Sequence, residues 1–232
     1  MKNIAFVPIR KGSKGIPGKN IKSLGNRPLF CWTLDTLIKS KSFDEIWLAT
    51  DCDEAISLSK NRYGKKVNIY KRSQESATDD SPVTNVIKEF IKFRELKEYD
   101  WLCLFQVTSP FTTIDEVSKL ISAIKSEKYD SIVSCTRIKK FRWNEKGIPL
   151  DYNLEKKPHR QEYKGFLVES GAFYASRIQA LRFSPYILSG KIGIIELNYY
   201  SHIEIDEPID WDITEHIAKK IENNSTSTNQ GY

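Results

Sequence analysis

The sequence is poor in the residues that most often hold metals or form redox pairs, with only four cysteines and three histidines among its 232 residues. Cys31, Cys52, Cys103 and Cys135 are far apart and form no Cys-x-x-Cys pair, so neither a zinc site nor a redox pair is indicated. Each lies in or beside an apolar run, and we expect buried free thiols in a reducing compartment. The histidines show no metal spacing and accompany no convincing nucleophile.

Long apolar runs are absent as well. No run approaches the roughly 18 residues that a membrane-spanning helix requires. The first residues have the pattern of a strand and not of a signal peptide. We therefore expect a cytoplasmic protein without a membrane segment.

The composition is that of a globular chain, with 40% hydrophobic and 28% charged residues. Its length suits one domain, which we expect at residues 1–222, and the Ser/Thr/Asn-rich residues 223–232 are expected to form a disordered tail. The net charge of +6 indicates an anionic partner. Basic residues are spread along the chain, apart from the first loop and residues 156–164, which favours a small anion over nucleic acid.

Short apolar runs alternate with segments of helical periodicity over the first 135 residues. This alternation predicts an α/β fold with a parallel sheet covered by helices on both faces. Strands are expected at 4–8, 45–50, 66–70, 101–105 and 131–135, and helices at 28–38, 53–62, 82–91 and 114–124.

The rhythm changes after residue 136. A mostly polar stretch is followed by strand-like pieces around Gly171 and again near residue 195. We expect segment 137–200 to contain an insertion that leaves and rejoins the main sheet, and such arms commonly dimerise. Isoleucines at 209, 213, 217 and 221 predict a final helix.

The first predicted strand leads into a basic loop, residues 8–20, with three glycines. Glycines let backbone N–H groups turn inward without Cβ clashes, and cations add positive charge, so the loop suits a chain of phosphates. Two familiar phosphate motifs are absent, because Ser13 and Asn20 break the P-loop pattern and the glycines lack the dinucleotide-binding spacing. A solvated basic loop is the alternative. The four cations are Arg10, Lys11, Lys14 and Lys19.

Polar residues follow several predicted strands directly. In parallel sheets ligands bind at the carboxyl ends of the strands, so Arg10, Asp51, Arg72 and Gln106 are expected in one crevice. An amide at the position of Gln106 can read the hydroxyls of a polar substrate, and a purely structural role is equally open. Residues 71–81 suit closure over a nucleotide base or a solvated loop that ends in a helix cap.

An acidic segment near the end of the chain suggests a metal site. Ile203–Asp206 alternates apolar and acidic residues as a short strand does, which would place Glu204 and Asp206 on one face. Mg²⁺ favours one or two carboxylates together with substrate phosphates. The alternative is an acidic cluster that favours the dipole of the last helix, and for Asp210 that alternative is preferred.

Taken together, these motifs resemble the acylneuraminate cytidylyltransferases. The basic loop at residues 8–20 is similar to their signature, and shorter matches extend the resemblance over residues 3–222. These are Thr50-Asp51, Arg72 to Ser81, Gln106 to Pro110, Phe141-Arg142-Trp143, Pro158 to Gln161, Glu169 to Tyr174, and Ile203 to Trp211.

The resemblance implies a reaction in which CTP and an acylneuraminate give a CMP-sugar and pyrophosphate. It also implies Mg²⁺, a Rossmann-like mostly parallel α/β fold of three layers, and a dimer whose arm reaches the partner's site. Neither nucleic acid nor membrane is an expected partner.

The resemblance also implies roles for individual residues. Lys19, Arg10 and Asp206 match the catalytic positions. The nucleotide positions match Arg10, Ser13, Lys19, Asn20, Arg72 and Ser81; the sugar positions match Gln106, Ser170 and Arg160; and the metal positions match Asp206 and Glu204.

Two residues depart from the family pattern, and three rival functions stay open. The family usually has Asp in place of Glu204 and Asn in place of Ser170, so the second metal ligand and one sugar contact are open. Within the enzyme class, the acceptor could be Kdo or a legionaminic-type sugar. Outside it, the rivals are a basic single-strand nucleic-acid binder and a non-catalytic nucleotide sensor.

Overall fold

The computed structural model of this chain describes residues 1–12, 15–78 and 80–227. Its centre is a seven-stranded sheet in the order β5-β4-β1-β6-β8-β7-β9. Every neighbouring pair is parallel except the two made by β8, which runs antiparallel to β6 and to β7. The strands are β1 (Asn3–Pro8), β4 (Glu45–Thr50), β5 (Asn68–Lys71), β6 (Trp101–Phe105), β7 (Ser131–Ile138), β8 (Phe166–Arg177) and β9 (Ile192–Leu197).

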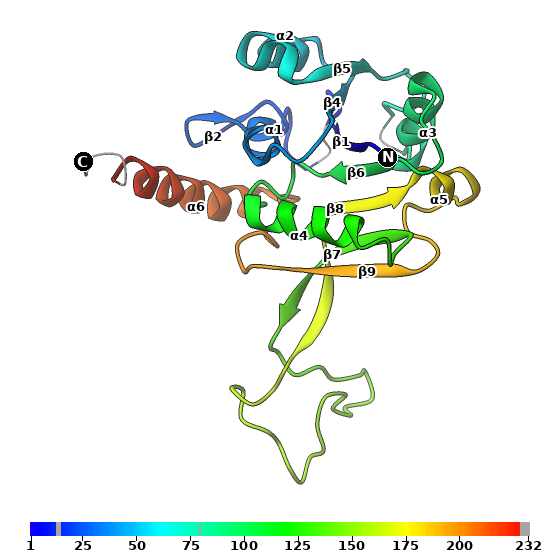
Figure 1. Cartoon of the computed structure of the whole chain (residues 1–232). Helices are drawn as coiled ribbons and strands as arrows, with labels where there is room; N and C mark the ends of the chain where they lie inside the picture. Colours follow the sequence, from blue (N-terminus) through cyan, green and yellow to red (C-terminus); the bar gives the residue numbers. More distant parts are fainter. Residues whose placement is uncertain (13–14, 79, 228–232) are drawn as a thin grey trace.

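Helices cover both faces of the sheet, so the predicted three-layer, mostly parallel α/β fold is confirmed (Figure 1). One layer contains α1 (Leu29–Ser40), α2 (Asp53–Tyr63), α4 (Ile114–Lys125) and α6 (Pro208–Ser227). The opposite layer contains α3 (Val83–Arg94) and the short α5 (Ile178–Phe183). A small hairpin, β2 (Ser23–Leu24) with β3 (Arg27–Pro28), precedes α1.

Strand β1 shows why the sequence folds into layers. Successive side chains of a strand point to opposite faces. Ala5 and Val7 therefore pack against the α1 and α4 layer, whereas Ile4 and Phe6 pack against α3. The ring centroids of Phe6 and Phe90 lie 4.7 Å apart. A strand buried on both faces is continuously apolar, which is the pattern that predicted it.

Two predicted elements differ from the observed ones. Residues 66–70 do not all form a strand, because Gly64–Lys66 makes a short 3-10 turn and β5 begins only at Asn68. Residues Ile203–Asp206 are not a strand either. Ile205 is instead held by a backbone hydrogen bond, from its N–H to the carbonyl of Thr108 just after β6 (2.9 Å).

The last helix is longer than the sequence predicted. We expected a tail from residue 223, but α6 continues to Ser227, since neither glycine nor proline interrupts residues 223–227. The rest of the predicted tail lies outside the described residues. None of the helices in the described part of the chain has the length and apolarity that crossing a membrane requires.

The inserted segment is shorter than the range 137–200 within which it was expected. Strands β7 and β8 extend beyond the sheet as a two-stranded ribbon, and residues 139–165 form the arm at its end (Figure 1). Strand β9 and most of β8 belong to the main sheet. The arm has its own small aromatic cluster, in which Phe141 packs against Tyr152 and Tyr163.

Candidate active site

A polar cleft of about 390 Å³ opens at the carboxyl ends of β1, β5 and β6. Residues from widely separated parts of the sequence meet there, as the rule for parallel sheets predicts. Its lining is Pro8, Ile9, Arg10, Gly12, Lys19, Asn20, Arg72, Ser81, Val83, Gln106, Val107, Thr108, Glu204 and Asp206.

Lys19 is the buried cation of this cleft, with only 8% of its surface exposed. Its ammonium group donates a hydrogen bond to the carbonyl oxygen of Ile205 and lies 3.6 Å from a carboxylate oxygen of Asp206. A buried ammonium needs such oxygen partners to offset lost hydration. The basic loop and the acidic segment are therefore parts of one site.

Glycine allows this approach. A Cβ on Gly15 would collide with the carbonyl oxygen of Asp206, so a larger residue there would push the loop away from the acidic segment. Farther along the loop, the side-chain amide of Asn20 donates to the carbonyl oxygen of Arg10 (2.9 Å) and closes the turn. Gly18, which has a φ of 63°, permits the left-handed turn before Lys19.

Two arginines, Arg10 and Arg72, also line the cleft. Arg72 follows β5 and donates to the carbonyl oxygen of Ser76, which holds the loop before α3. Burial lowers the pKa of Arg72 from its ordinary value, while Asp51 and Glu89 oppose that shift. Arg10 reaches the same loop through the carbonyl of Thr78 (3.4 Å).

Asp51, which was also expected in the crevice, does not line it. Its carboxylate accepts a hydrogen bond from the backbone N–H of Lys11 (2.8 Å) and anchors the start of the basic loop. Strand β4 pairs with β1 in the sheet, so Asp51, which follows β4, lies beside the start of the loop that follows β1.

Glu204 and Gln106 meet over Gly171. A Cβ at Gly171 would collide with the Glu204 carboxylate and would lie 2.8 Å from the amide oxygen of Gln106. Burial, followed by the negative charge of Asp206, raises the pKa of Glu204 above its ordinary value, and Lys19 opposes that shift. Glycine at this point lets the β8 backbone approach these two side chains, which line the cleft.

The acidic segment is held by its backbone. The carboxylate of Asp210 accepts hydrogen bonds from the N–H groups of Asp206 (3.1 Å) and Glu207 (2.8 Å) at the start of α6. Asp210 therefore has the helix-terminal role that the sequence predicted for it. The Asp206 side chain remains 70% exposed and faces the cleft.

These carboxylates fit a divalent cation that also binds substrate oxygens. Over residues 1–12, 15–78 and 80–227, no group of three or more His, Cys, Asp or Glu side chains is placed to hold a metal by itself. Glu204 and Asp206 supply two carboxylates. Repulsion between them helps to raise the pKa of Glu204, and Mg²⁺ would neutralise that repulsion. Phosphate oxygens would supply the remaining ligands.

The other expected site residues lie elsewhere. Ser13 falls outside the described residues. Ser170 is 5% exposed and does not line the cleft, and its hydroxyl has no hydrogen-bond partner among the described residues. Arg160 lies on the exposed arm and does not line the cleft of its own chain.

The structure also adds residues that the sequence did not single out. Gly15 and Gly171 allow the two closest approaches at the site, and Thr108 contributes a backbone carbonyl that fixes Ile205. The glycines of the basic loop could be recognised in the sequence, but their contacts with distant segments could not be predicted from it.

An apolar cavity of about 540 Å³ adjoins the cleft and shares Val83 and Gln106 with it. Its other lining residues are Pro82, Thr84, Leu104, Glu169, Tyr174, Pro185, Tyr186, Ile187 and Leu188. The cleft and this cavity therefore form a polar compartment and an apolar compartment joined at Gln106.

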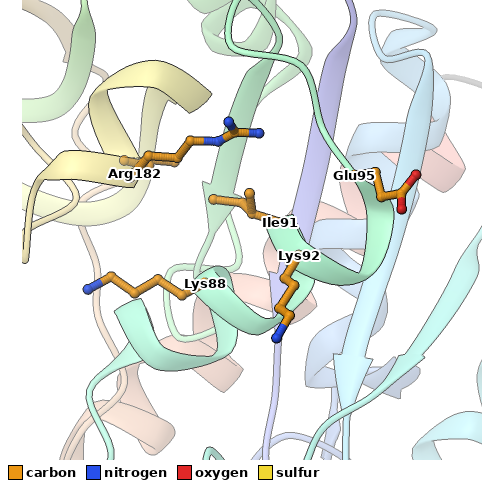
Figure 2. Close-up of a pocket in the computed structure, with 6 residues that line it drawn as sticks. Lys88, Ile91, Lys92, Glu95 and Arg182 are labelled. Carbon is orange, nitrogen blue, oxygen red and sulfur yellow. The ribbon is translucent and has the colours of Figure 1, made fainter.

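A third cavity, of about 550 Å³, lies between α3 and α5. In Figure 2, Ile91 lies between the side chains of Lys88 and Arg182. All three of its cations, which include Lys92, are exposed, and no predicted site residue lines it. We assign this cavity no part in the chemistry below.

Comparison with known proteins identifies the family. The cytidylyltransferase family model matches residues 4–228. The chain belongs to the cytidylyltransferase family. The resemblance inferred from the sequence motifs is thereby confirmed.

Curated relatives of this chain include N-acylneuraminate cytidylyltransferase A of Danio rerio, with 34% identity over 91% of this chain and 49% of that protein. Another is the CMP-N,N'-diacetyllegionaminic acid synthase of Legionella pneumophila, with 30% identity over 94% of this chain and 97% of that protein. The chain spans about half the length of the acylneuraminate enzymes of fish that it matches.

Solved structures share the fold. A CMP:2-keto-3-deoxy-manno-octonic acid synthetase complexed with CTP matches 95% of this chain and 99% of its own chain, with a TM-score of 0.67 at 16% identity. The 4-diphosphocytidyl-2C-methyl-D-erythritol synthase of Anaerococcus prevotii matches with a TM-score of 0.62, also at 16% identity. At this identity the likeness concerns the Rossmann-like fold alone.

Proposed function

We propose that this chain transfers CMP from CTP to the anomeric hydroxyl of an acylneuraminate and releases pyrophosphate. The observation that carries the proposal is the position of Lys19, a buried cation of the basic loop that lies against Asp206 in a cleft also lined by Gln106. Relatives named N-acylneuraminate cytidylyltransferase support the choice of both substrates.

The nucleotide occupies the polar compartment. Lys19, Arg10 and the N–H groups of the basic loop bind the triphosphate, and Asn20 keeps the turn closed. Arg72 and Ser81, which line the far side of the cleft, contact the cytidine end. Ser13 is expected to join them from the same loop.

The acceptor occupies the side of the cleft at Gln106. The Gln106 amide reads sugar hydroxyls, and the adjoining apolar cavity takes the acyl part of the sugar. This arrangement directs the anomeric oxygen toward the α-phosphorus. The new bond forms between these atoms while the bond from the α-phosphorus to the pyrophosphate oxygen breaks and the hydroxyl proton is released.

Positioning and charge neutralisation drive such a transfer. Lys19 and Arg10 stabilise the negative charge that develops on the phosphate oxygens. Asp206 and Glu204 would hold Mg²⁺, which when bound supplies Lewis-acid stabilisation of phosphate oxygens.

The active form is a homodimer in which the arm of one protomer reaches the cleft of the other. The arm exposes large apolar side chains, among them Trp143 (50% exposed) and Leu154 (67% exposed), as interaction surfaces do. In this dimer Arg160 of each arm contacts the sugar bound by the partner. Four buried free cysteines support a reducing, cytoplasmic location.

The test is pyrophosphate release from CTP with Mg²⁺ and a panel of acidic sugars. We expect turnover with an acylneuraminate, none without an acceptor, and little with ATP in place of CTP. Full activity without any sugar would contradict the proposal. A preference for a legionaminic-type sugar would instead support the second candidate, which the match over 97% of the Legionella enzyme favours.

The dimer has a separate test. Arg160→Ala and Lys19→Ala variants, each inactive alone, are mixed after reversible unfolding. If the arm acts on the partner's cleft, the mixture regains activity, to about a quarter of the wild-type rate for random pairing. A mixture that stays inactive while it forms dimers would place Arg160 outside the partner's site.

A further inference from the structure

Strand β8 carries a large bulge beside the cleft. Val133 pairs with Tyr174 and Cys135 pairs with Glu169, so β7 contributes only Ser134 where β8 contributes the four residues Ser170–Phe173. A bulge bends its strand and leaves backbone groups without ladder partners. Strand β8 pairs with β7 on both sides of the bulge, whereas its pairing with β6 covers only Phe173–Arg177.

The side-chain hydroxyl of Ser134 links the bulge to β7. The Ser134 hydroxyl donates to the carbonyl oxygen of Phe173 (2.8 Å) and accepts from the N–H of the same residue (3.0 Å). Ser134 is fully buried, so no water is available to replace these bonds. On the other side, the N–H of Gln106 donates to the carbonyl of Ala172 (3.1 Å).

The bulge lies next to both compartments of the site. One of its residues, Gly171, lies directly against Glu204 and Gln106, which line the polar cleft. The residues at its two ends, Glu169 and Tyr174, line the apolar cavity, where the Tyr174 hydroxyl donates to Glu169 (2.5 Å). Displacement of the bulge would therefore change the acceptor side more than the triphosphate side.

We propose that Ser134 is a positioning residue for the acceptor sugar, which it never touches. The Ser134 hydroxyl holds the bulge in place. The bulge in turn positions Gly171 and Gln106, and these two residues define where the sugar lies. The proposal deepens the proposed function and rests on it for the identity of the acceptor. Geometric precision matters here, since misplacing reacting groups by about 1 Å can cost about a hundredfold in rate.

The kinetic test compares Ser134→Ala with Ser134→Thr and with Ile124→Val. We expect Ser134→Ala to lower kcat/KM for the sugar by about 10- to 100-fold while the KM for CTP changes by less than about twofold. Ser134→Thr keeps the hydroxyl and should recover much of the loss. Ile124→Val, in the buried last turn of α4, controls for general destabilisation and should leave both KM values near wild type.

A second measurement does not depend on turnover. Hydrogen exchange at the amides of residues 171–174 and Gln106 should rise in Ser134→Ala and not in Ile124→Val. Unchanged exchange there, or equal rises in the KM values for sugar and CTP, would overturn the proposal. If the wild-type protein uses no acidic sugar at all, the proposed function fails, and the exchange result alone decides whether Ser134 holds the bulge.

Discussion

The ammonium group of Lys19 and the carboxylate of Asp206 lie 3.6 Å apart, which brings the first loop of the chain to the start of its last helix. The Lys19 side chain is buried, whereas that of Asp206 is 70% exposed and open to the cleft. This relationship makes the cation a fixed part of the site and leaves the carboxylate available to a ligand.

Replacing Lys19 by alanine should lower kcat by about 10²–10³-fold, the usual effect of removing one well-placed donor to a developing negative charge. Lys11→Ala is the matched control, because Lys11 is an exposed cation of the same loop whose backbone contacts Asp51. Steady-state pyrophosphate release measures both. Similar losses in the two variants would indicate that only the net charge of the loop matters.

Alanine at Gly15 should weaken CTP binding and lower stability by about 1–3 kcal/mol, because the added Cβ collides with the Asp206 carbonyl. Gly12→Ala has nothing within 4 Å of its added Cβ and should leave the melting temperature unchanged. Thermal melts without ligand provide the comparison. Equal melting temperatures for the two variants would show that the loop moves aside without cost.

Glu116 holds the segment that leads to the acidic residues. Its buried carboxylate accepts bonds from Thr113, Asn198 and Ser201, all at 2.8–2.9 Å. Glu116→Ala removes the acceptor of Thr113 and Asn198, whereas the Ser201 hydroxyl can still donate to the carbonyl of Phe111 (2.9 Å), and the change should cost about 2–4 kcal/mol. It should also reduce activity, since Glu204 and Asp206 lose their support.

Asp115→Ala is the control for Glu116, because Asp115 lies in the same first turn of α4 and is exposed. Its effect on the free energy of unfolding should stay below about 1 kcal/mol. Urea titrations of both variants at neutral pH measure the difference. A Glu116→Ala variant as stable as Asp115→Ala would contradict the support that we assign to Glu116.

Acid should destabilise the protein through Glu45. Although burial opposes the shift, hydrogen bonds from Lys2, Trp47 and Arg94 lower its pKa from 4.5 to about 2. A carboxyl whose folded pKa is lowered stabilises the fold above its unfolded pKa, and that stability disappears as the pH falls from about 4.5 to about 2.

Glu45→Gln should therefore lose about 1–3 kcal/mol at pH 7, after allowance for the solvent exposure of Lys2 and Arg94, and nothing at pH 2. Asp53→Asn, which removes an ion pair exposed on both sides, should show no such pH dependence. Urea unfolding across this pH range tests both. A constant difference between wild type and Glu45→Gln would refute the assignment.

Local periodicity was sufficient to predict most of the fold. The strands β1, β4, β6 and β7 and the helices that separate them are local patterns, because burial on both faces of a strand and on one face of a helix repeats over a few residues. The parallel sheet then followed from their alternation. Because ligands bind at the carboxyl ends of parallel strands, Arg10, Arg72 and Gln106 could be placed together without any knowledge of the family.

Contacts between distant segments could not be predicted in this way. Nothing local indicates that β8 runs against its neighbours or that Ser134 faces four residues of that strand. The contact of Gly15 with Asp206 likewise depends on how the whole chain closes. The change of pattern after residue 136 predicted that Arg160 lies in an insertion, whereas the direction in which residues 139–165 project required the structure (Figure 1).

Strand β8 joins the main sheet to the arm that projects from it (Figure 1). The arm leads directly into Phe166, and only Phe166–Glu169 separate it from the bulge beside the cleft. One strand therefore carries both the arm and Gly171, which lies against Glu204 and Gln106. A partner bound to the arm would act on this same strand, so binding at the arm and the geometry of the cleft would be coupled.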